Sequence, residues 1–265
     1  KDGDTYVCKG FETVADYKLK CHVFSTIGSH GSLTVEQALM NSCNPYMIHL
    51  ALEMGNSRFA YYQSLFGFGK ITGIELPGET TGIVYGDRMT TIDAACNSFG
   101  QTINVNMMQM MAAYCSIING GMLYQPHIVK RIESANGEVV KEYKANLVRQ
   151  TITASTSKLL RRYLKNTVEE GTAKKAGVTG YSVAGKTGTA QKGDRKDNKW
   201  IISFIGHAPA ENPKFAIYVV IDEPYGTTGT SGSSADVLTL THNILEKLLP
   251  YMNVYKDASD EYEDT

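Results

Sequence analysis

The chain has 265 residues, of which 42% are hydrophobic and 20% are charged. A chain of this length and composition can bury a sizeable core as one large domain or two closely packed lobes, which excludes fibrous and disordered proteins. Its 26 basic residues nearly balance 27 acidic ones, so no net field favours nucleic acid or an anionic membrane. Its longest apolar runs are far shorter than the roughly 20 residues of a membrane-spanning helix. We therefore expect a globular protein without a transmembrane segment that recognises its ligand through local groups.

The first half of the chain has the apolar spacing of helices. Residues 32–55 predict two helices interrupted at Asn44-Pro45, because proline breaks a helix, and this leaves Ser42-Cys43-Asn44 at the junction. Residues 57–69 and 104–121 predict two further helices that end at glycines.

The second half begins with a predicted helix over residues 153–172, whose start is rich in Ser and Thr. Three apolar, β-branched segments follow at residues 181–191, 200–210 and 214–224, and the short loops between them indicate antiparallel hairpins. Residues 234–252 predict a closing helix. The tail, residues 255–265, is acidic and is expected to be disordered.

Five cysteines form no Cys-x-x-Cys pair and are too few for a disulfide scaffold. Three of them lie in apolar helical contexts and are expected to be small core residues: Cys43, Cys96 and Cys115. Cys8 and Cys21 differ, because they bracket a short polar segment, and Cys21-His22 is followed by His30. A disulfide, a zinc site and free thiols all remain open for them, although the spacing matches no standard zinc pattern.

The segment GYSVAGKTGTAQ contains, from Gly180 to Thr187, the spacing of a phosphate-binding loop. Such a loop needs a buried strand before its first glycine and a helix starting at its Lys-Thr pair. Here the preceding residues AKKAGVT are polar, and the following GTAQKGDRKDN have no apolar period. We therefore reject an ATPase and interpret residues 181–191 as a strand.

Lys186-Thr187-Gly188 on a strand edge suggests another chemistry. An ammonium and a hydroxyl on one edge can bind a substrate carboxylate, and Gly188 would let a substrate backbone approach and pair as an added strand. The N–H of Thr189 could then polarise a carbonyl.

At this Lys-Thr-Gly segment the sequence resembles the transpeptidase domain of the penicillin-binding proteins, especially those of class B. Ser42 and Asn44 stand at the positions of the family's Ser-x-Asn motif. The segments FGFGKITGIELPGE, NSFGQTINVNMMQMMAAYCSIINGG and SFIGHAPAENP also follow its pattern, so the resemblance covers residues 8 to 251.

The resemblance implies an α/β fold of the α+β type, similar to penicillin-binding proteins and serine β-lactamases. It consists of an antiparallel sheet flanked by helices, with an all-helical lobe. We expect residues 1–254 to form a transpeptidase domain that lacks its N-terminal part. The helical lobe would lie mainly in residues 30–120, and the sheet with its closing helix in residues 178–252.

The resemblance further implies a peptidoglycan D,D-transpeptidase that cross-links stem peptides ending in D-Ala-D-Ala and binds β-lactam antibiotics. Cell-wall synthesis proteins would be its partners, and the extracytoplasmic face of the bacterial membrane its location, with the anchor outside this chain. The implied catalytic residues are Ser42 for proton relay, Asn44 for holding the substrate amide, and Lys186. The implied substrate-binding residues are Ser42, Asn44, Lys186, Thr187, Gly188 and Thr189. No cofactor and no metal belongs to this implied site.

The nucleophilic Ser-x-x-Lys of the family has no match in residues 1–41. One match, Ser155 to Lys158, lies in the wrong order between the other two motifs and is interpreted as a helix N-cap. The first residues, KDGDTYVCKGF, contain neither Met nor an apolar leader. We therefore expect a chain that begins downstream of the nucleophile and is inactive alone. A non-catalytic scaffold or binding module and a β-lactam-hydrolysing or β-lactam-sensing relative remain alternatives.

Overall fold

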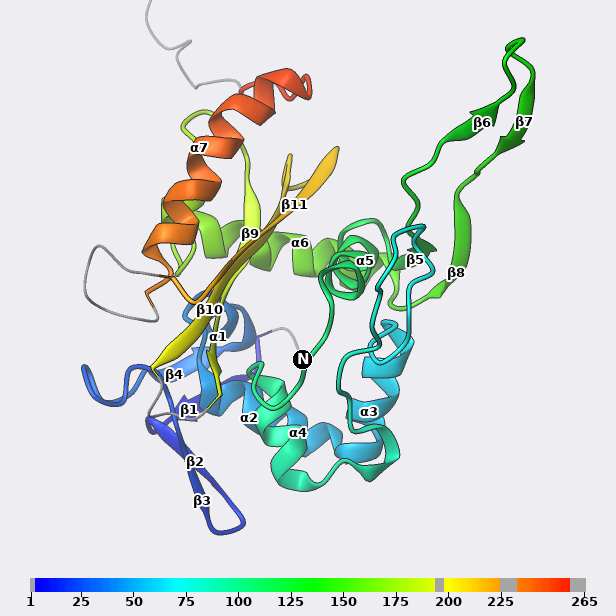
Figure 1. Ribbon diagram of the computed structural model, residues 1–265. Helices are drawn as coiled ribbons and strands as arrows, with labels where there is room; N and C mark the ends of the chain where they lie inside the picture. The colour runs from blue at the N-terminus through cyan, green and yellow to red at the C-terminus, as the bar shows by residue number, and fades with distance from the viewer. Residues whose placement is uncertain (1–2, 194–197, 225–232, 258–265) are drawn as a thin grey trace, which may run out of the picture. The chain divides into compact units, whose positions relative to one another are not determined.

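The computed structural model describes residues 3–193, 198–224 and 233–257 (Figure 1). The chain divides into two compact units. The first unit combines residues 1–56, 90–102 and 159–265, and the second combines residues 57–89 and 103–158. From residue 258 onward, the predicted acidic tail lies outside the described residues. Among the described helices, none is both long enough and apolar enough to cross a membrane.

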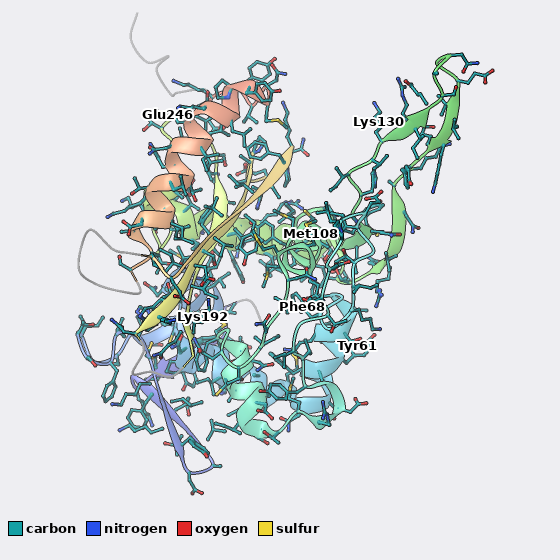
Figure 2. All side chains as sticks on the ribbon, viewed as in Figure 1. Tyr61, Phe68, Met108, Lys130, Lys192 and Glu246 are labelled. Carbon is teal, nitrogen blue, oxygen red and sulfur yellow. The ribbon has the colours of Figure 1, made fainter. Side chains whose placement is uncertain are left out.

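The first unit contains an antiparallel sheet in the order β11-β10-β9, as predicted. Its strands are β9 (Ala184–Lys192), β10 (Lys199–Ala208) and β11 (Phe215–Asp222). The closing helix α7 (Ala235–Tyr251) contacts β10 and β11. The core between them is made of fully buried apolar side chains: Ile202, Phe204, Val237, Leu245 and Leu249. At the far end of β9, Lys192 pairs with Asp222 at 2.9 Å, and Figure 2 labels this lysine.

Of the segment that matches a phosphate loop, residues 184–187 lie within β9, and the predicted strand begins three residues later than expected. The strand continues through Lys192, so no helix starts at Lys186-Thr187, and the prediction of a strand is confirmed. A Cβ at Gly185 would lie 2.3 Å from Cζ of Phe204 and 2.6 Å from the carbonyl oxygen of Ile205. This glycine is therefore explained by close packing against β10, without any phosphate.

The N-terminal part of the first unit contains four strands that the sequence analysis did not predict. β1 (Thr5–Cys8) pairs with β4 (Gly31–Thr34), and β2 (Phe11–Val14) pairs with β3 (Tyr17–Lys20). The interpretation of the whole first half as helical is wrong here. Each strand has only four residues and little buried surface, so no sustained alternation marks it in the sequence.

The predicted helix break at Asn44-Pro45 is confirmed. α1 (Val35–Met40) begins at a capping box in which Thr34 and Gln37 exchange side-chain and backbone hydrogen bonds. Three residues separate the end of α1 from the start of α2 (Asn44–Met54), which has Pro45 in its first turn, where its missing N–H costs nothing. α2 packs against α4 (Thr91–Ser98).

The helix α6 (Ala154–Glu169) confirms the predicted helix but not its cap. The hydroxyl of Thr153 accepts the N–H of Thr156 at 3.2 Å, so Thr153 caps the helix. Ser155 lies inside the first turn, and its hydroxyl lies 2.9 Å from the Thr153 hydroxyl. The assignment of Ser155 as the cap is wrong, because the cap is Thr153, two residues earlier. A short helix, η2 (Lys174–Ala176), follows α6.

The second unit contains α3 (Asn56–Leu65), η1 (Gly86–Arg88) and α5 (Met107–Ile118), and α3 and α5 were predicted. Figure 2 labels Met108 on α5. Two two-stranded antiparallel sheets were not predicted. One pairs β5 (Met122–Gln125) with β8 (Asn146–Gln150), and the other pairs β6 (Arg131–Glu133) with β7 (Val139–Glu142). Most of their residues are exposed, so they lack the apolar pattern that indicates a strand. The predicted limits of a helical lobe at 30–120 remain predictions.

Candidate functional site

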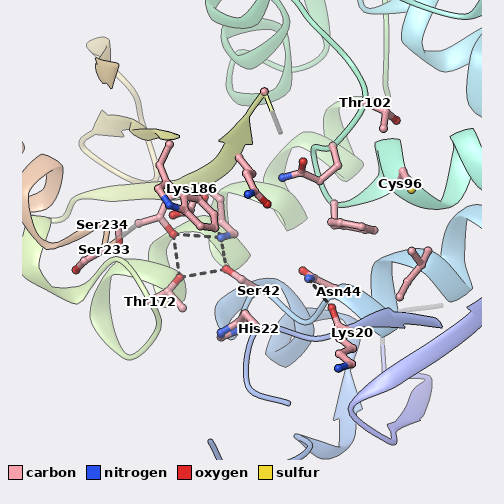
Figure 3. Close-up of a pocket in the computed structure, with 18 residues that line it drawn as sticks. Lys20, His22, Ser42, Asn44, Cys96, Thr102, Thr172, Lys186, Ser233 and Ser234 are labelled. Carbon is pink, nitrogen blue, oxygen red and sulfur yellow. Dashed lines mark hydrogen bonds between the residues drawn. The ribbon is translucent and has the colours of Figure 1, made fainter. Parts of the chain in front are cut away.

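A pocket of about 860 Å³ in the first unit brings most of the predicted site residues together (Figure 3). The predicted residues that line it are Ser42, Asn44, Lys186, Thr187 and Thr189. They come from the turn between α1 and α2 and from β9. The two motifs are far apart in the sequence, so only the folded chain places them in one pocket.

Lys186 and Ser42 are in direct contact. Nζ of Lys186 donates a hydrogen bond to Oγ of Ser42, and a second one to the carbonyl oxygen of Thr187 at 3.1 Å. The same nitrogen lies 3.4 Å from Oγ1 of Thr187. The Lys-Thr-Gly and Ser-x-Asn segments are thus joined by a cation and two hydroxyl groups.

Thr172 completes this network, and the sequence analysis missed it. Its Oγ1 lies 3.4 Å from Oγ of Ser42 and 3.3 Å from Oγ1 of Thr187. The preceding Gly171 explains this position. A Cβ there would lie 2.8 Å from the carbonyl oxygens of both Met40 and Thr167. The Thr172 N–H donates to the Met40 carbonyl at 3.1 Å. The Gly-Thr pair after a helix is the only local signal that could have pointed to this residue.

The turn that carries Ser42 has an unusual backbone. Ser42 has a φ of +52°, in the left-handed region that costs a non-glycine residue of the order of 1 kcal/mol. Backbone hydrogen bonds hold the turn: Ser42 N–H donates to Leu39 O at 3.2 Å and Cys43 N–H to Ala38 O at 2.9 Å. Ser42 and Asn44 line the pocket, while Cys43 between them is completely buried, as predicted.

Asn44 is the first residue of α2, and its Nδ2 donates to the carbonyl oxygen of Lys20 at 3.3 Å. This bond runs from the helix to the last residue of β3 and orients the amide beside the pocket. Lys20 and His22 also line the pocket, which sequence reasoning did not foresee.

Gly188, in contrast, is not among the residues that line the pocket. It pairs with Ser203 on β10, and a Cβ on Gly188 would lie 2.6 Å from Oγ of Ser203. Close packing against β10 therefore explains why residue 188 is a glycine. Its predicted role in admitting a substrate backbone remains a prediction.

The electrostatics of the pocket favour an anion. Burial lowers the pKa of Lys186 from 10.5 to about 8, because desolvation disfavours the ammonium. The described lining residues include Lys20 and Lys186 but no carboxylate. A carboxylate that enters the pocket would stabilise the Lys186 ammonium, which burial has removed from water. The site is therefore suited to a singly charged acidic group.

The rest of the wall consists of residues that the sequence did not single out. Phe99 and Gln101 follow α4, and Trp200 lies on β10. Apolar rings beside hydroxyl and amide groups are typical of a small-molecule or peptide site, in which a few polar groups fix orientation. Ser155 is not among the lining residues.

The disulfide that one interpretation proposed for Cys8 and Cys21 is wrong. All five cysteines are free thiols in the structure. Nδ1 of His30 lies 3.9 Å from Sγ of Cys8 and 3.6 Å from Sγ of Cys21.

Comparison with known proteins agrees with these motifs. Residues 4–246 match the family described as the penicillin binding protein transpeptidase domain. The chain is 39% identical over 256 residues to Stage V sporulation protein D of Bacillus subtilis, covering 95% of this chain and 39% of that protein. It is 32% identical over 248 residues to the peptidoglycan D,D-transpeptidase FtsI of Escherichia coli, covering 91% of this chain and 40% of FtsI. The chain thus spans about two fifths of the length of these relatives.

Solved structures show the same fold. Penicillin binding protein 3 of Mycobacterium tuberculosis, complexed with ampicillin, superposes with a TM-score of 0.85 at 28% identity, covering 97% of this chain and 59% of that chain. The predicted fold class is confirmed: a mixed α/β transpeptidase fold with antiparallel sheets and helices. The chain therefore belongs to the transpeptidase-domain family of the penicillin-binding proteins, with relatives of the class B type.

Proposed function

We propose that this chain supplies the substrate-binding part of a peptidoglycan D,D-transpeptidase that acts by serine acyl transfer. The observation that carries the proposal is the hydrogen bond from Lys186 to Ser42, which joins two family motifs in a pocket without a described carboxylate. The names of relatives such as the peptidoglycan D,D-transpeptidase FtsI support the same reaction.

The proposed substrates are stem peptides ending in D-Ala-D-Ala, and β-lactams would bind in the same way. Lys186, which is mostly protonated at neutral pH, and the Thr187 hydroxyl bind the terminal carboxylate. Asn44 holds the substrate amide. β9 is at the edge of the described three-stranded sheet, so its outer edge, with Gly188 and Thr189, can pair with an extended peptide.

In the proposed reaction a serine attacks the penultimate D-Ala carbonyl and D-Ala leaves as the amine. An amine of a second peptide then takes the acyl group. Ser42, whose hydroxyl contacts both Lys186 and Thr172, passes a proton toward the leaving amine. The oxyanion contact from the Thr189 N–H would stabilise the tetrahedral intermediate.

The nucleophile is proposed to lie in a part of the protein outside these 265 residues. Residues 1–41 contain no Ser-x-x-Lys, and Ser155 does not line the pocket. We accordingly propose that the chain alone is not acylated. The proposed location is the extracytoplasmic face of the bacterial membrane, where cell-wall synthesis proteins are its partners.

Labelling with a fluorescent penicillin tests the proposal. We expect no covalent adduct on residues 1–265 and a stable adduct on the longer protein encoded by the same reading frame. In the longer protein, Lys186→Ala should slow acylation by about 10- to 100-fold, because a charged hydrogen bond to the carboxylate is lost. Ser155→Ala serves as the control and should leave the rate unchanged.

Three results would contradict this function. An adduct on residues 1–265 would place the nucleophile within this chain. A longer protein that folds but never forms an adduct would indicate a non-catalytic scaffold. Rapid release of hydrolysed penicillin would indicate a β-lactam-hydrolysing enzyme.

A further inference from the structure

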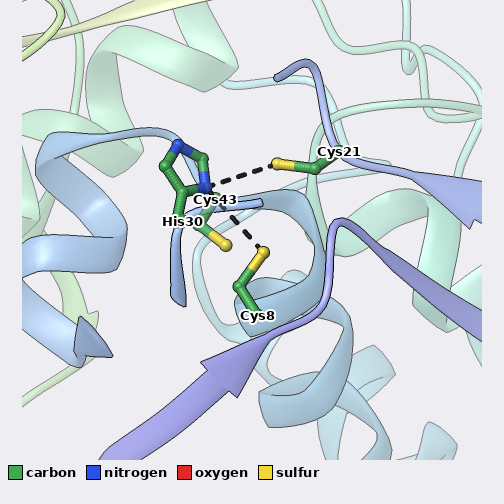
Figure 4. Close-up of side chains that lie close together, drawn as sticks. All are labelled: Cys8, Cys21, His30 and Cys43. Carbon is green, nitrogen blue, oxygen red and sulfur yellow. Dashed lines mark hydrogen bonds between the residues drawn. The ribbon is translucent and has the colours of Figure 1, made fainter. Parts of the chain in front are cut away.

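Four potential metal ligands meet in the N-terminal part of the first unit. Sγ of Cys8, Sγ of Cys21, Sγ of Cys43 and a ring nitrogen of His30 all lie within 4.8 Å of one another (Figure 4). They come from four different places: the end of β1, the residue after β3, the residue before β4, and the N-cap of α2. Four segments of the chain therefore converge on one point.

The separations match a single tetrahedral ion. With Zn–S bonds of about 2.3 Å and Zn–N bonds of about 2.0 Å, neighbouring sulfur and nitrogen ligands stand about 3.6 Å apart. Nδ1 of His30 lies 3.6 Å from Sγ of Cys21 and 3.9 Å from Sγ of Cys8. Cys43 contacts the sulfurs of both Cys21 and Cys8.

The His30 nitrogen cannot serve all three thiols as a hydrogen-bond acceptor. A neutral imidazole nitrogen accepts one proton, yet three thiols surround it. Cys8 is 1% exposed, Cys21 3% and Cys43 0%, so water does not reach these thiols. A cation that binds three deprotonated sulfurs and the nitrogen resolves the crowding.

Backbone groups are arranged to support thiolates. The N–H of Gly10 donates to Sγ of Cys8 at 3.4 Å. The backbones of Val23 and Asn44 form hydrogen bonds with the Cys21 side chain, and the backbone of Tyr46 with that of Cys43. Hydrogen bonds from such outer groups orient metal ligands and stabilise their charge.

We propose that Cys8, Cys21, His30 and Cys43 bind one Zn²⁺ ion in a closed tetrahedral site. Three thiolates and an imidazole are a standard structural zinc set, and four protein ligands leave no position for a reacting water. The ligand atoms converge on one point, so they fit a single ion rather than an iron–sulfur cluster. The ion is structural and takes no part in chemistry.

The ion also acts on the turn that carries two pocket residues. Cys43 stands between Ser42 and Asn44, and its bond to the metal fixes the backbone where Ser42 has a φ of +52°. The paired strands β1–β4 and β2–β3 form two-stranded sheets, which are marginally stable alone. A metal ion that links these strands to the start of α2 adds stability that their small hydrophobic core does not provide.

Metal analysis of the complete protein that carries this chain, purified without a polyhistidine tag or chelator, tests the site. We expect one zinc per chain by inductively coupled plasma mass spectrometry. Cys8→Ser, His30→Ala and Cys43→Ala should each reduce the zinc content at least tenfold. Cys115→Ala and His22→Ala are matched controls and should retain it. Retention in His30→Ala together with loss in His22→Ala would overturn the ligand assignment.

X-ray absorption on the unaltered protein covers the case in which ligand variants fail to fold. We expect three sulfur neighbours at about 2.3 Å and one nitrogen at about 2.0 Å. A shell of oxygen and nitrogen alone would overturn the proposal, as would protein that takes up no zinc from a zinc salt. A Cys8–Cys21 disulfide found by mass spectrometry under non-reducing conditions would do so too. These measurements need no catalysis, so they can fail or succeed independently of the proposed transpeptidase function.

Discussion

Lys186 is subject to two opposing requirements. Its ammonium is buried against the hydroxyls of Ser42 and Thr187, and desolvation lowers its pKa to about 8. The proposed substrate carboxylate would require the charged form, whereas the folded protein without substrate is destabilised by it. The anion-binding role proposed for Lys186 thus carries a cost in stability, which is a common feature of functional residues.

The pH dependence of stability reveals this cost. In the unfolded chain Lys186 keeps its proton up to about pH 10.5, but in the folded chain it releases the proton near pH 8. Below pH 8 the lysine is protonated in both states, and the full cost of burying its charge is present. Between pH 8 and 10.5 the unfolded state binds more protons than the folded state, so the free energy of unfolding rises with pH. Lys186→Met should therefore raise the free energy of unfolding by about 1–3 kcal/mol at pH 7, and by much less at pH 10.5.

Urea unfolding at both pH values measures this difference. Lys192→Met is the control on the same strand, because Lys192 is exposed and paired with Asp222 and Glu223; it should give no stabilisation at pH 7. A gain for Lys186→Met that is equal at the two pH values would show that improved packing, not the removed charge, is responsible.

At the scale of elements, the segment after α6 packs against the end of α1, and sequence periodicity could not reveal this contact. Gly171 allows the chain after α6 to pass against the Met40 carbonyl, and this places Thr172 between Ser42 and Thr187. The glycine has no positive φ, so its requirement comes from close approach alone.

Gly171→Ala should destabilise the protein by about 1–3 kcal/mol, because the new Cβ would meet two backbone oxygens that cannot move freely. Gly177→Ala is the matched control, since its Cβ would come no closer than 3.3 Å to a neighbour. Thermal unfolding of both variants measures the effect. Equal melting temperatures for the two variants would mean that the contact at Gly171 is not tight.

On the scale of the whole molecule, the first unit is assembled from three separate stretches of chain. Ser42, Phe99 and Lys186 each come from a different stretch and line one pocket. The proposed zinc ion lies in the first of these stretches, where the cluster around Cys8, Leu33 and Tyr46 is small. We expect this stretch to depend on the ion more than the core beneath α7 does.

Removal of the ion should therefore destabilise the protein. A ligand that binds only the folded state adds its binding free energy to stability, and a loss of several kcal/mol would lower the melting temperature by about 10 °C. Differential scanning calorimetry with and without a strong zinc chelator measures the shift. Cys43→Ala provides the control, because chelator should not shift it further. An unshifted melting temperature in zinc-loaded protein would contradict a structural role.

Much of the fold could be predicted because local patterns determine it. The apolar, β-branched segments at 200–210 and 214–224 form β10 and β11. Pro45 marks the break before α2. The four-residue strands β1 to β4 could not be predicted, since strands this short carry no period. The cap of α6 was misplaced by two residues because Thr153 and Ser155 are equally good caps by composition.

The sequence by itself determined the family, the order of the Ser-x-Asn and Lys-Thr-Gly motifs, and the chemistry that a lysine and hydroxyls can offer to a carboxylate. These follow from residue type and local spacing. Only the tertiary structure decided that Thr172 joins Ser42 to Thr187, and that Cys43, expected to be a core residue, meets Cys8, Cys21 and His30. The reason is physical: such neighbours are up to 130 positions apart, and their meeting depends on how helices and strands pack, which no local pattern encodes.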